Sequence, residues 1–136
     1  STDSTEQICK KYNVKFVQRE FRGFMDQKNY AVSLASHPYI LSLDADEALS
    51  SELQKSLLKV KNNIEFEGYK VNRLSNYCGK WIRHSAWYPD PQLRLFRADR
   101  GSCSSANCQT GRPLRSRARI TPGYSGQKYS HGWRNQ

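Results

Sequence analysis

The spacing of apolar residues divides residues 1–100 into helical and extended segments. Apolar positions that recur every three or four residues predict helices at residues 4–12, 24–36 and 50–61. Short apolar or alternating runs predict strands at residues 14–18, 39–43, 66–74 and 92–98. Helices and strands therefore alternate along the chain. This order predicts an α/β domain with a mainly parallel sheet.

The predicted helices begin and end at residues that favour such boundaries. Asp3 and Glu6 have the spacing of a capping box at the start of the first helix. Pro38 ends the second helix, because the residue before a proline disfavours the helical conformation. Ser50 or Ser51 is suited to cap the third helix.

Charge is unevenly distributed along the 136 residues, whose net charge is +10. Residues 1–100 carry 16 Lys and Arg and 12 acids, a balance of +4, whereas residues 101–136 carry 6 Lys and Arg and no acid, a balance of +6. Segments with so few apolar residues cannot bury enough surface to offset chain entropy. We therefore predict a partial domain at residues 1–100 and a low-complexity, disordered basic tail at residues 101–136. A shift of reading frame near Gly101 is one hypothesis for the origin of this tail.

Three acids, Asp44, Asp46 and Glu47, follow the apolar strand "YILSL". One interpretation is a turn that also caps the next helix, because acids are favoured at such positions. The other is a site for a hard cation such as Mg²⁺ or Mn²⁺, which is usually held by one or two carboxylates and substrate phosphates. No Lys or Arg lies within four residues of the acids. In open α/β sheets, ligands bind beyond the carboxyl ends of the strands, where these acids are expected.

Several motifs occur together in an order typical of one enzyme family. They are "STDST" at a helix start, "QKNYAVSLA" before the apolar strand and "LDADE" after it. With "FRGFMDQKNYAVSLASHPYILSLDADEALSSEL" and "RLSNYCGKWIRHSAWYPDPQLRLFR", they make residues 1–100 resemble family 2 glycosyltransferases of the GT-A fold. Within that family, these stretches resemble the bacterial lipopolysaccharide-core β-glucosyltransferase group.

The resemblance implies an inverting transfer of a hexose, glucose in this group, from a nucleotide-diphosphate sugar such as UDP-glucose. It implies that Asp44 and Asp46 hold Mg²⁺ or Mn²⁺ against the diphosphate, with Asp46 the better ligand, Asp44 also near the ribose and Glu47 a weaker candidate. The acceptor would be a lipopolysaccharide-core or related glycan or glycolipid. The enzyme is then expected in the cytoplasm, with peripheral contact at the inner membrane.

Further residues are assigned by the same resemblance, each with a plainer alternative. Asp90 is the expected general base, although Tyr88-Pro89-Asp90-Pro91 also has the composition of a turn. The aromatic residues expected to bind the acceptor also suit a core, and the basic residues also suit a solvated surface. Expected nucleotide-sugar contacts are Arg22, Lys28, Asn29 and Asp44; phosphate contacts are Arg94 and Arg97; acceptor contacts are Trp81, Trp87 and Tyr88.

The chain also departs from the family pattern. The two strands that precede the "STDST" motif in the family are missing, so we expect a fragment that lacks the uracil side of the donor site. After residue 100 we find no motif of the family. A non-catalytic fragment is therefore an alternative function, and a basic nucleic-acid-binding protein is another, suggested by a pI of about 9.7. The four cysteines are interpreted as free thiols, with disulfides as the alternative.

Overall fold

A computed structural model describes residues 4–100 and 117–120, the latter as backbone. Within these residues the helices are Thr5–Lys11 (α1), Phe24–Ser33 (α2) and Ser51–Asn62 (α3). The strands are Tyr39–Leu41 (β1), Gly68–Arg73 (β2), Ser75–Tyr77 (β3), Lys80–Ile82 (β4), Asp90–Arg97 (β5) and Arg117–Ile120 (β6). Short 3₁₀ turns lie at Ser85–Trp87 (η1) and Ala98–Arg100 (η2). The three predicted helices and the last three predicted strands are confirmed, with shifted ends.

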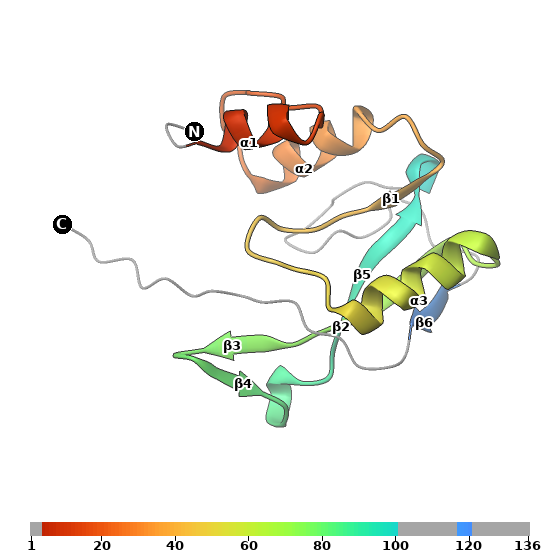
Figure 1. Ribbon diagram of the computed structural model, residues 1–136. Coiled ribbons are helices and arrows are strands. Elements are labelled where there is room, and N and C mark those ends of the chain that lie inside the picture. Colours follow the sequence, from red (N-terminus) through yellow and green to blue (C-terminus); the bar gives the residue numbers. More distant parts are fainter. Residues whose placement is uncertain (1–3, 101–116, 121–136) are drawn as a thin grey trace.

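The main sheet has the strand order β1-β5-β2-β6 (Figure 1). Strand β5 is antiparallel to both of its neighbours, and only β2 and β6 pair in parallel. The prediction of a mainly parallel sheet is therefore wrong. Residues 74–89 return the chain from β2 to β5 without a crossover helix, and strands joined in this way pair antiparallel. Strands β1 and β2, which α3 connects, do run in the same direction, but β5 lies between them.

The strand predicted at residues 14–18 is also wrong, because these residues form an irregular segment between α1 and α2. Val14 and Val17 are exposed there, at 53% and 38%. No described strand pairs with this segment, and an extended run without a partner gains neither ladder hydrogen bonds nor a buried face. Helices α1 and α2 likewise contain no fully buried residue.

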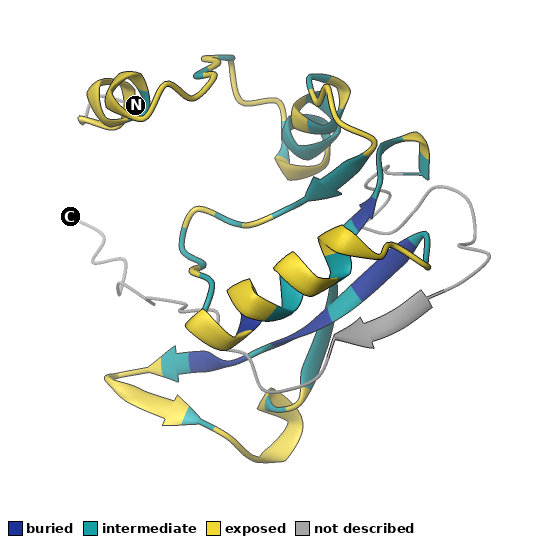
Figure 2. Ribbon diagram, turned by 45° about the vertical axis from the view of Figure 1, so that its right-hand side comes forward, coloured by how far each residue is buried: buried dark blue, intermediate teal, exposed yellow. Residues whose placement is uncertain are grey.

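The core lies between α3 and the sheet. Leu53 of α3 packs with Tyr69 and Val71 of β2 and with Leu74, and all four are at most 5% exposed. Figure 2 shows α3 with its outer face exposed and the buried part of β2 beneath it. The helix begins at this position because the Ser50 hydroxyl accepts a hydrogen bond of 3.2 Å from the Leu53 amide. This packing fixes the loop that precedes α3 above β5.

The composition boundary near residue 101 is followed by residues that the structure describes only in part. Residues 117–120 form β6, whereas the prediction of a disordered tail expected no strand there. Residues 101–116 and 121–136 lie outside the described residues, and so does the prediction made for them. In the described part of the chain, no helix combines the length and apolarity needed to span a membrane.

Candidate active site

The acids after β1 form a tight turn, which we call the acid loop and define as residues 44–47. The Glu47 amide donates a hydrogen bond of 3.0 Å to the Asp44 carbonyl oxygen. In return, the Asp44 amide donates one of 3.1 Å to Oε2 of Glu47. This reciprocal pair closes the loop, so the proposed turn interpretation holds for its backbone.

Arg94 of β5 lies beneath the acid loop because the strand is irregular at this residue. Tyr69 of β2 pairs with Leu95 and Lys70 pairs with Leu93, so that Arg94 has no partner in β2. An extra residue of this kind bends a strand and can re-aim a side chain, and such bulges are frequent beside active sites. The Arg94 carbonyl oxygen accepts a hydrogen bond of 2.8 Å from the Ser42 amide, which ties the start of the acid loop to β5.

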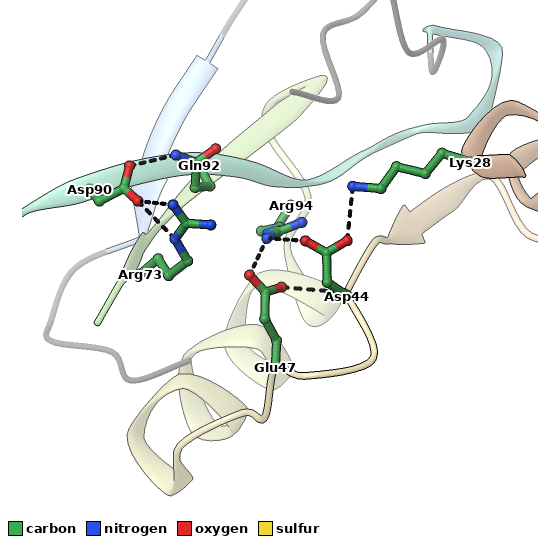
Figure 3. Close-up of polar contacts among 7 residues, drawn as sticks. All are labelled: Lys28, Asp44, Glu47, Arg73, Asp90, Gln92 and Arg94. Carbon is green, nitrogen blue, oxygen red and sulfur yellow. Dashed lines mark hydrogen bonds and ion pairs between the residues drawn. The ribbon is translucent and has the colours of Figure 1, made fainter. Parts of the chain in front are cut away.

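A network of ion pairs joins the acid loop to α2 and β5 (Figure 3). Nζ of Lys28 lies 2.8 Å from Oδ1 of Asp44, and Nη2 of Arg94 lies 3.2 Å from Oδ2 of the same residue. Nη2 of Arg94 also contacts Oε1 of Glu47, whose side chain is only 4% exposed. The absence of basic residues near the acids in the sequence was therefore misleading, because both partners come from other elements.

The electrostatic balance of Asp44 follows from these contacts. Burial raises the pKa of Asp44, but the hydrogen bond from Lys28 and the positive charge of Arg94 lower it, and the net pKa lies below its ordinary value. Asp44 is therefore ionised at neutral pH, with both of its carboxylate oxygens engaged by cations.

Asp46 differs from the other two acids of the loop. It is half-buried, and it forms no hydrogen bond or ion pair with any residue in the part of the chain that the structure describes. Two of the three carboxylates in the loop are thus neutralised by the protein, and the third is left available. Among the described residues no group of three or more His, Cys, Asp or Glu side chains is placed to hold a metal ion.

A single free carboxylate is nevertheless compatible with a site for Mg²⁺ or Mn²⁺. Such ions keep several waters and are often held by one or two carboxylates together with substrate phosphates, so a full protein cage is not needed. The donor set at the acid loop fits this mode through Asp46, with Asp44 as a second carboxylate only if Lys28 or Arg94 releases one of its oxygens.

Asp90 begins β5 and belongs to a second polar cluster. Its Oδ2 accepts a hydrogen bond of 2.8 Å from Nε of Arg73 and forms an ion pair with Nη2 of the same residue at 2.6 Å. Its Oδ1 accepts a hydrogen bond from Nε2 of Gln92. Arg73 and Asp90 are direct partners in the β2–β5 ladder, and this antiparallel register brings them together. A carboxylate has about four lone-pair sites, so Asp90 keeps the capacity to accept a further proton or hydrogen bond.

One pocket connects the two clusters. Glu47 and Arg94 line it on the side of the acid loop, and Arg73 and Gln92 line it on the side of Asp90. Its apolar wall includes Leu53 and other residues of the α3 side. The acid loop and Asp90 thus lie along β5 on the two sides of this pocket, and each contacts residues that line it (Figure 3).

The remaining predicted residues are more dispersed. Arg22 is exposed and pairs with Glu20 at 3.6 Å, and Asn29 is half-buried in α2. Arg97 forms its ion pair with Asp99 at 3.0 Å, at the end of β5 away from Asp90. It is therefore not brought together with Arg94, whose guanidinium is engaged by the acid loop.

The aromatic residues predicted to bind the acceptor divide into two groups. Tyr88 packs against the core cluster, as the plainer alternative proposed. Trp81 and Trp87 are exposed, at 41% and 50%. Sequence reasoning did not identify Arg73 or Gln92. Alternation along β5 with Asp90 was a signal for Gln92, but Arg73 required the antiparallel register.

Comparison with known proteins identifies the family of the chain. The sequence profile described as "Glycosyl transferase family 2" matches residues 1–118, which extends past the composition boundary near residue 101. A lipopolysaccharide core biosynthesis glycosyltransferase of Rhizobium meliloti is 28% identical over 107 residues, which are 74% of this chain and 40% of that protein.

Uncharacterized glycosyltransferases of Rickettsia are also similar. That of Rickettsia conorii is 42% identical over 77 residues, 54% of this chain and 27% of that protein. That of Rickettsia typhi is 33% identical over 82 residues, 58% of this chain and 28% of that protein. The matched parts thus span between about a quarter and two-fifths of these relatives. Because the family profile covers most of its length, the chain belongs to glycosyl transferase family 2, which implies the GT-A nucleotide-sugar transferase fold.

Proposed function

We propose that this chain carries the donor and base sites of an inverting hexosyltransferase. The donor is a nucleotide-diphosphate hexose, with UDP-glucose as the first candidate. The acceptor is a hydroxyl of a lipopolysaccharide-core or related glycan. Support for the acceptor class comes from the printed name of the Rhizobium relative and from the sequence motifs described above.

One observation carries the proposal: the acid loop leaves Asp46 free while Lys28 and Arg94 neutralise its neighbours. Three ionised carboxylates in one turn would repel both each other and an incoming diphosphate. With Asp44 and Glu47 paired, the loop presents a single carboxylate, Asp46, that would hold a divalent ion together with substrate phosphates. When bound there, the ion would neutralise the charge that develops on the leaving nucleoside diphosphate.

Asp90 is proposed as the general base, beside the end of the pocket that Arg73 and Gln92 line. The acceptor hydroxyl oxygen forms a bond to the anomeric carbon, and its proton passes to the Asp90 carboxylate. The bond between the anomeric carbon and the phosphate oxygen breaks, and the nucleoside diphosphate leaves with that electron pair. Arg73 and Gln92 fix the orientation of Asp90 by their hydrogen bonds, which is the requirement for a group that must be aimed.

The other predicted contacts remain proposals of different strength. Lys28 lies beside the acid loop, so it is well placed for the nucleotide side of the donor. Arg94 is more simply a support for the acid loop than a phosphate ligand, because its side chain is 10% exposed and already paired.

The proposal is tested with the purified complete gene product and a panel of nucleotide-diphosphate hexoses. Release of nucleoside diphosphate should require Mg²⁺ or Mn²⁺, stop on chelation and increase when a lipopolysaccharide-core acceptor is added. If turnover is fully retained after exhaustive chelation, the metal site is wrong. If no hexose donor is turned over with any glycan acceptor, the activity itself is wrong.

A further inference from the structure

A protrusion at one end of the sheet carries much of the exposed aromatic surface. We define the aromatic hairpin as residues 75–87, which comprise β3, β4 and η1. Figure 1 shows it projecting beyond β2, on the side of the molecule away from α1 and α2, and Figure 2 shows most of it exposed. Its rings are Tyr77, Trp81 and Trp87, which are 54%, 41% and 50% exposed.

Two of the exposed rings of the aromatic hairpin lie together, and Trp81 is on the opposite face of the β3–β4 pair from Tyr77. The centroids of Tyr77 and Trp87 lie 6.1 Å apart, with their planes inclined by 60°. Single exposed apolar residues are normal on a protein surface, but a group of aromatic side chains on one protrusion marks an interaction site. None of the three rings packs in the core cluster beneath α3.

The charge of this region is positive and uncompensated. Lys80 and Arg83 are exposed on the aromatic hairpin, and residues 74–89 contain no Asp or Glu. The next acid along the chain, Asp90, is paired with Arg73 at 2.6 Å. The surface therefore combines amphipathic aromatic rings with basic groups that have no acidic neighbour within that segment.

We propose that the aromatic hairpin docks on the surface of an anionic phospholipid bilayer. Trp and Tyr are enriched at the level of lipid headgroups, where one part of the ring is apolar and another is polar. Lys and Arg are drawn to anionic headgroups, and each strengthens binding by roughly fivefold. This inference goes beyond the proposed function and does not depend on it.

A sugar-binding platform is the competing use of Trp81 and Trp87. Sites for small polar ligands are usually concave and include aimed hydrogen-bonding groups. The pocket described above is lined by residues of the acid loop, α3, β2 and β5, and none of its lining residues belongs to the aromatic hairpin. A projecting, basic and aromatic surface fits the interface of a bilayer better than it fits a sugar.

Docking of this kind would have a consequence for the site. Arg73 and Asp90 are paired in the sheet where the chain leaves for the aromatic hairpin and where it returns. The proposed base therefore lies at the root of the aromatic hairpin. A bilayer held against the aromatic hairpin would bring lipid-linked acceptors to the end of the pocket that Arg73 and Gln92 line, beside Asp90.

The test is co-sedimentation of the complete gene product with lipid vesicles. Vesicles of phosphatidylcholine with a minority of phosphatidylglycerol should bind the protein, and vesicles of phosphatidylcholine alone should bind it weakly. The double variant Lys80→Glu/Arg83→Glu should lower the partition coefficient by at least roughly 25-fold, because two attractive charges are lost and two repulsive charges are added. The matched control Lys59→Glu/Lys61→Glu makes the same charge change on exposed positions of α3 and should have a much smaller effect.

A second pair of variants tests the rings. Trp81→Ser/Trp87→Ser should weaken vesicle binding, and Trp81→Tyr/Trp87→Tyr should restore most of it, since Tyr also favours the interface. Thermal melting checks that each variant is folded. If Trp81→Ser/Trp87→Ser does not fold, Lys80→Glu/Arg83→Glu still tests the proposal. The proposal would be overturned if vesicle binding survived Lys80→Glu/Arg83→Glu, or if this variant and the control Lys59→Glu/Lys61→Glu weakened vesicle binding equally. The proposal would also be overturned if the unmodified protein did not bind vesicles. The same holds if Trp81→Ser/Trp87→Ser bound vesicles normally but used a water-soluble glycan acceptor less well than the unmodified protein.

Discussion

The pairing of Arg94 with Glu47 predicts a large loss of stability when only the arginine is removed. The change is Arg94→Met, which keeps a long apolar side chain and removes the guanidinium. The Glu47 carboxylate then stays in place with a side chain that is 4% exposed and without its cation. Asp44 is affected less, because it is 30% exposed and keeps Lys28 as a partner.

The magnitude follows from this burial. Removing one partner of a buried ion pair typically costs about 3–5 kcal/mol, because the remaining charge is desolvated and uncompensated. This is a large share of the roughly 5–15 kcal/mol that stabilises an ordinary domain. The loss should appear in urea unfolding of the complete gene product as a lower midpoint with an unchanged slope.

Two matched variants isolate the cause. Arg97→Met removes the arginine of an exposed pair with Asp99, whose side chains are 44% and 55% exposed, and should change the midpoint little. Arg94→Met/Glu47→Gln removes both charges and should recover much of the stability lost in Arg94→Met. If Arg94→Met costs no more than about 1 kcal/mol, as an exposed pair does, the network does not support the acid loop.

Further predictions concern the base, the acid loop and the helix that follows it. Asp90→Asn should lower sugar transfer at least about 100-fold with donor affinity nearly unchanged, and a loss confined to donor affinity would argue against a base. Because the pKa of Asp44 is lowered in the folded state, its pairing stabilises the protein above about pH 4, and this contribution is lost as the pH falls through the lowered pKa. Asp44→Asn should therefore make the urea midpoint fall less steeply on the acid side of a plot against pH. An unchanged slope on the acid side would contradict this prediction. Ser50→Ala should cost about 1 kcal/mol in urea unfolding through loss of the cap of α3, and Ser51→Ala serves as its control.

Local patterns were sufficient to predict most elements but not how they pair. The apolar stripe that includes Leu53 and the cap at Ser50 specify α3 within a short stretch of sequence, and the structure confirms both. The direction of β5 depends on how residues 74–89 return the chain, and no periodicity within β5 encodes that. The segment at residues 14–18 has the composition of a strand, but it can form one only if another strand lies beside it to pair with.

The same division applies to the candidate site. The acid loop was found from the sequence because its three carboxylates lie within four residues. Its partners were missed, since Lys28 and Arg94 belong to α2 and β5 and meet the loop only in the folded chain. Within the resemblance, Arg94 was predicted to contact phosphate from its alternation with Arg97 along the strand. Alternation says which face of a strand a residue occupies, but not what lies on that face. A bulge at this residue alters even the face.

We propose above that Asp46 is the carboxylate that the acid loop offers to a divalent ion. The most direct test is titration of the complete gene product with Mn²⁺ in the presence of a nucleoside diphosphate, followed by the signal of free Mn²⁺ in electron paramagnetic resonance. Asp46→Asn should weaken Mn²⁺ binding at least about tenfold, because the loss of even a residue that only supports a metal ligand typically costs about 10- to 100-fold in affinity. The control Glu52→Gln, which removes an exposed acid from the first turn of α3, should leave it unchanged. Equal Mn²⁺ affinity in Asp46→Asn and the unmodified protein would contradict the account.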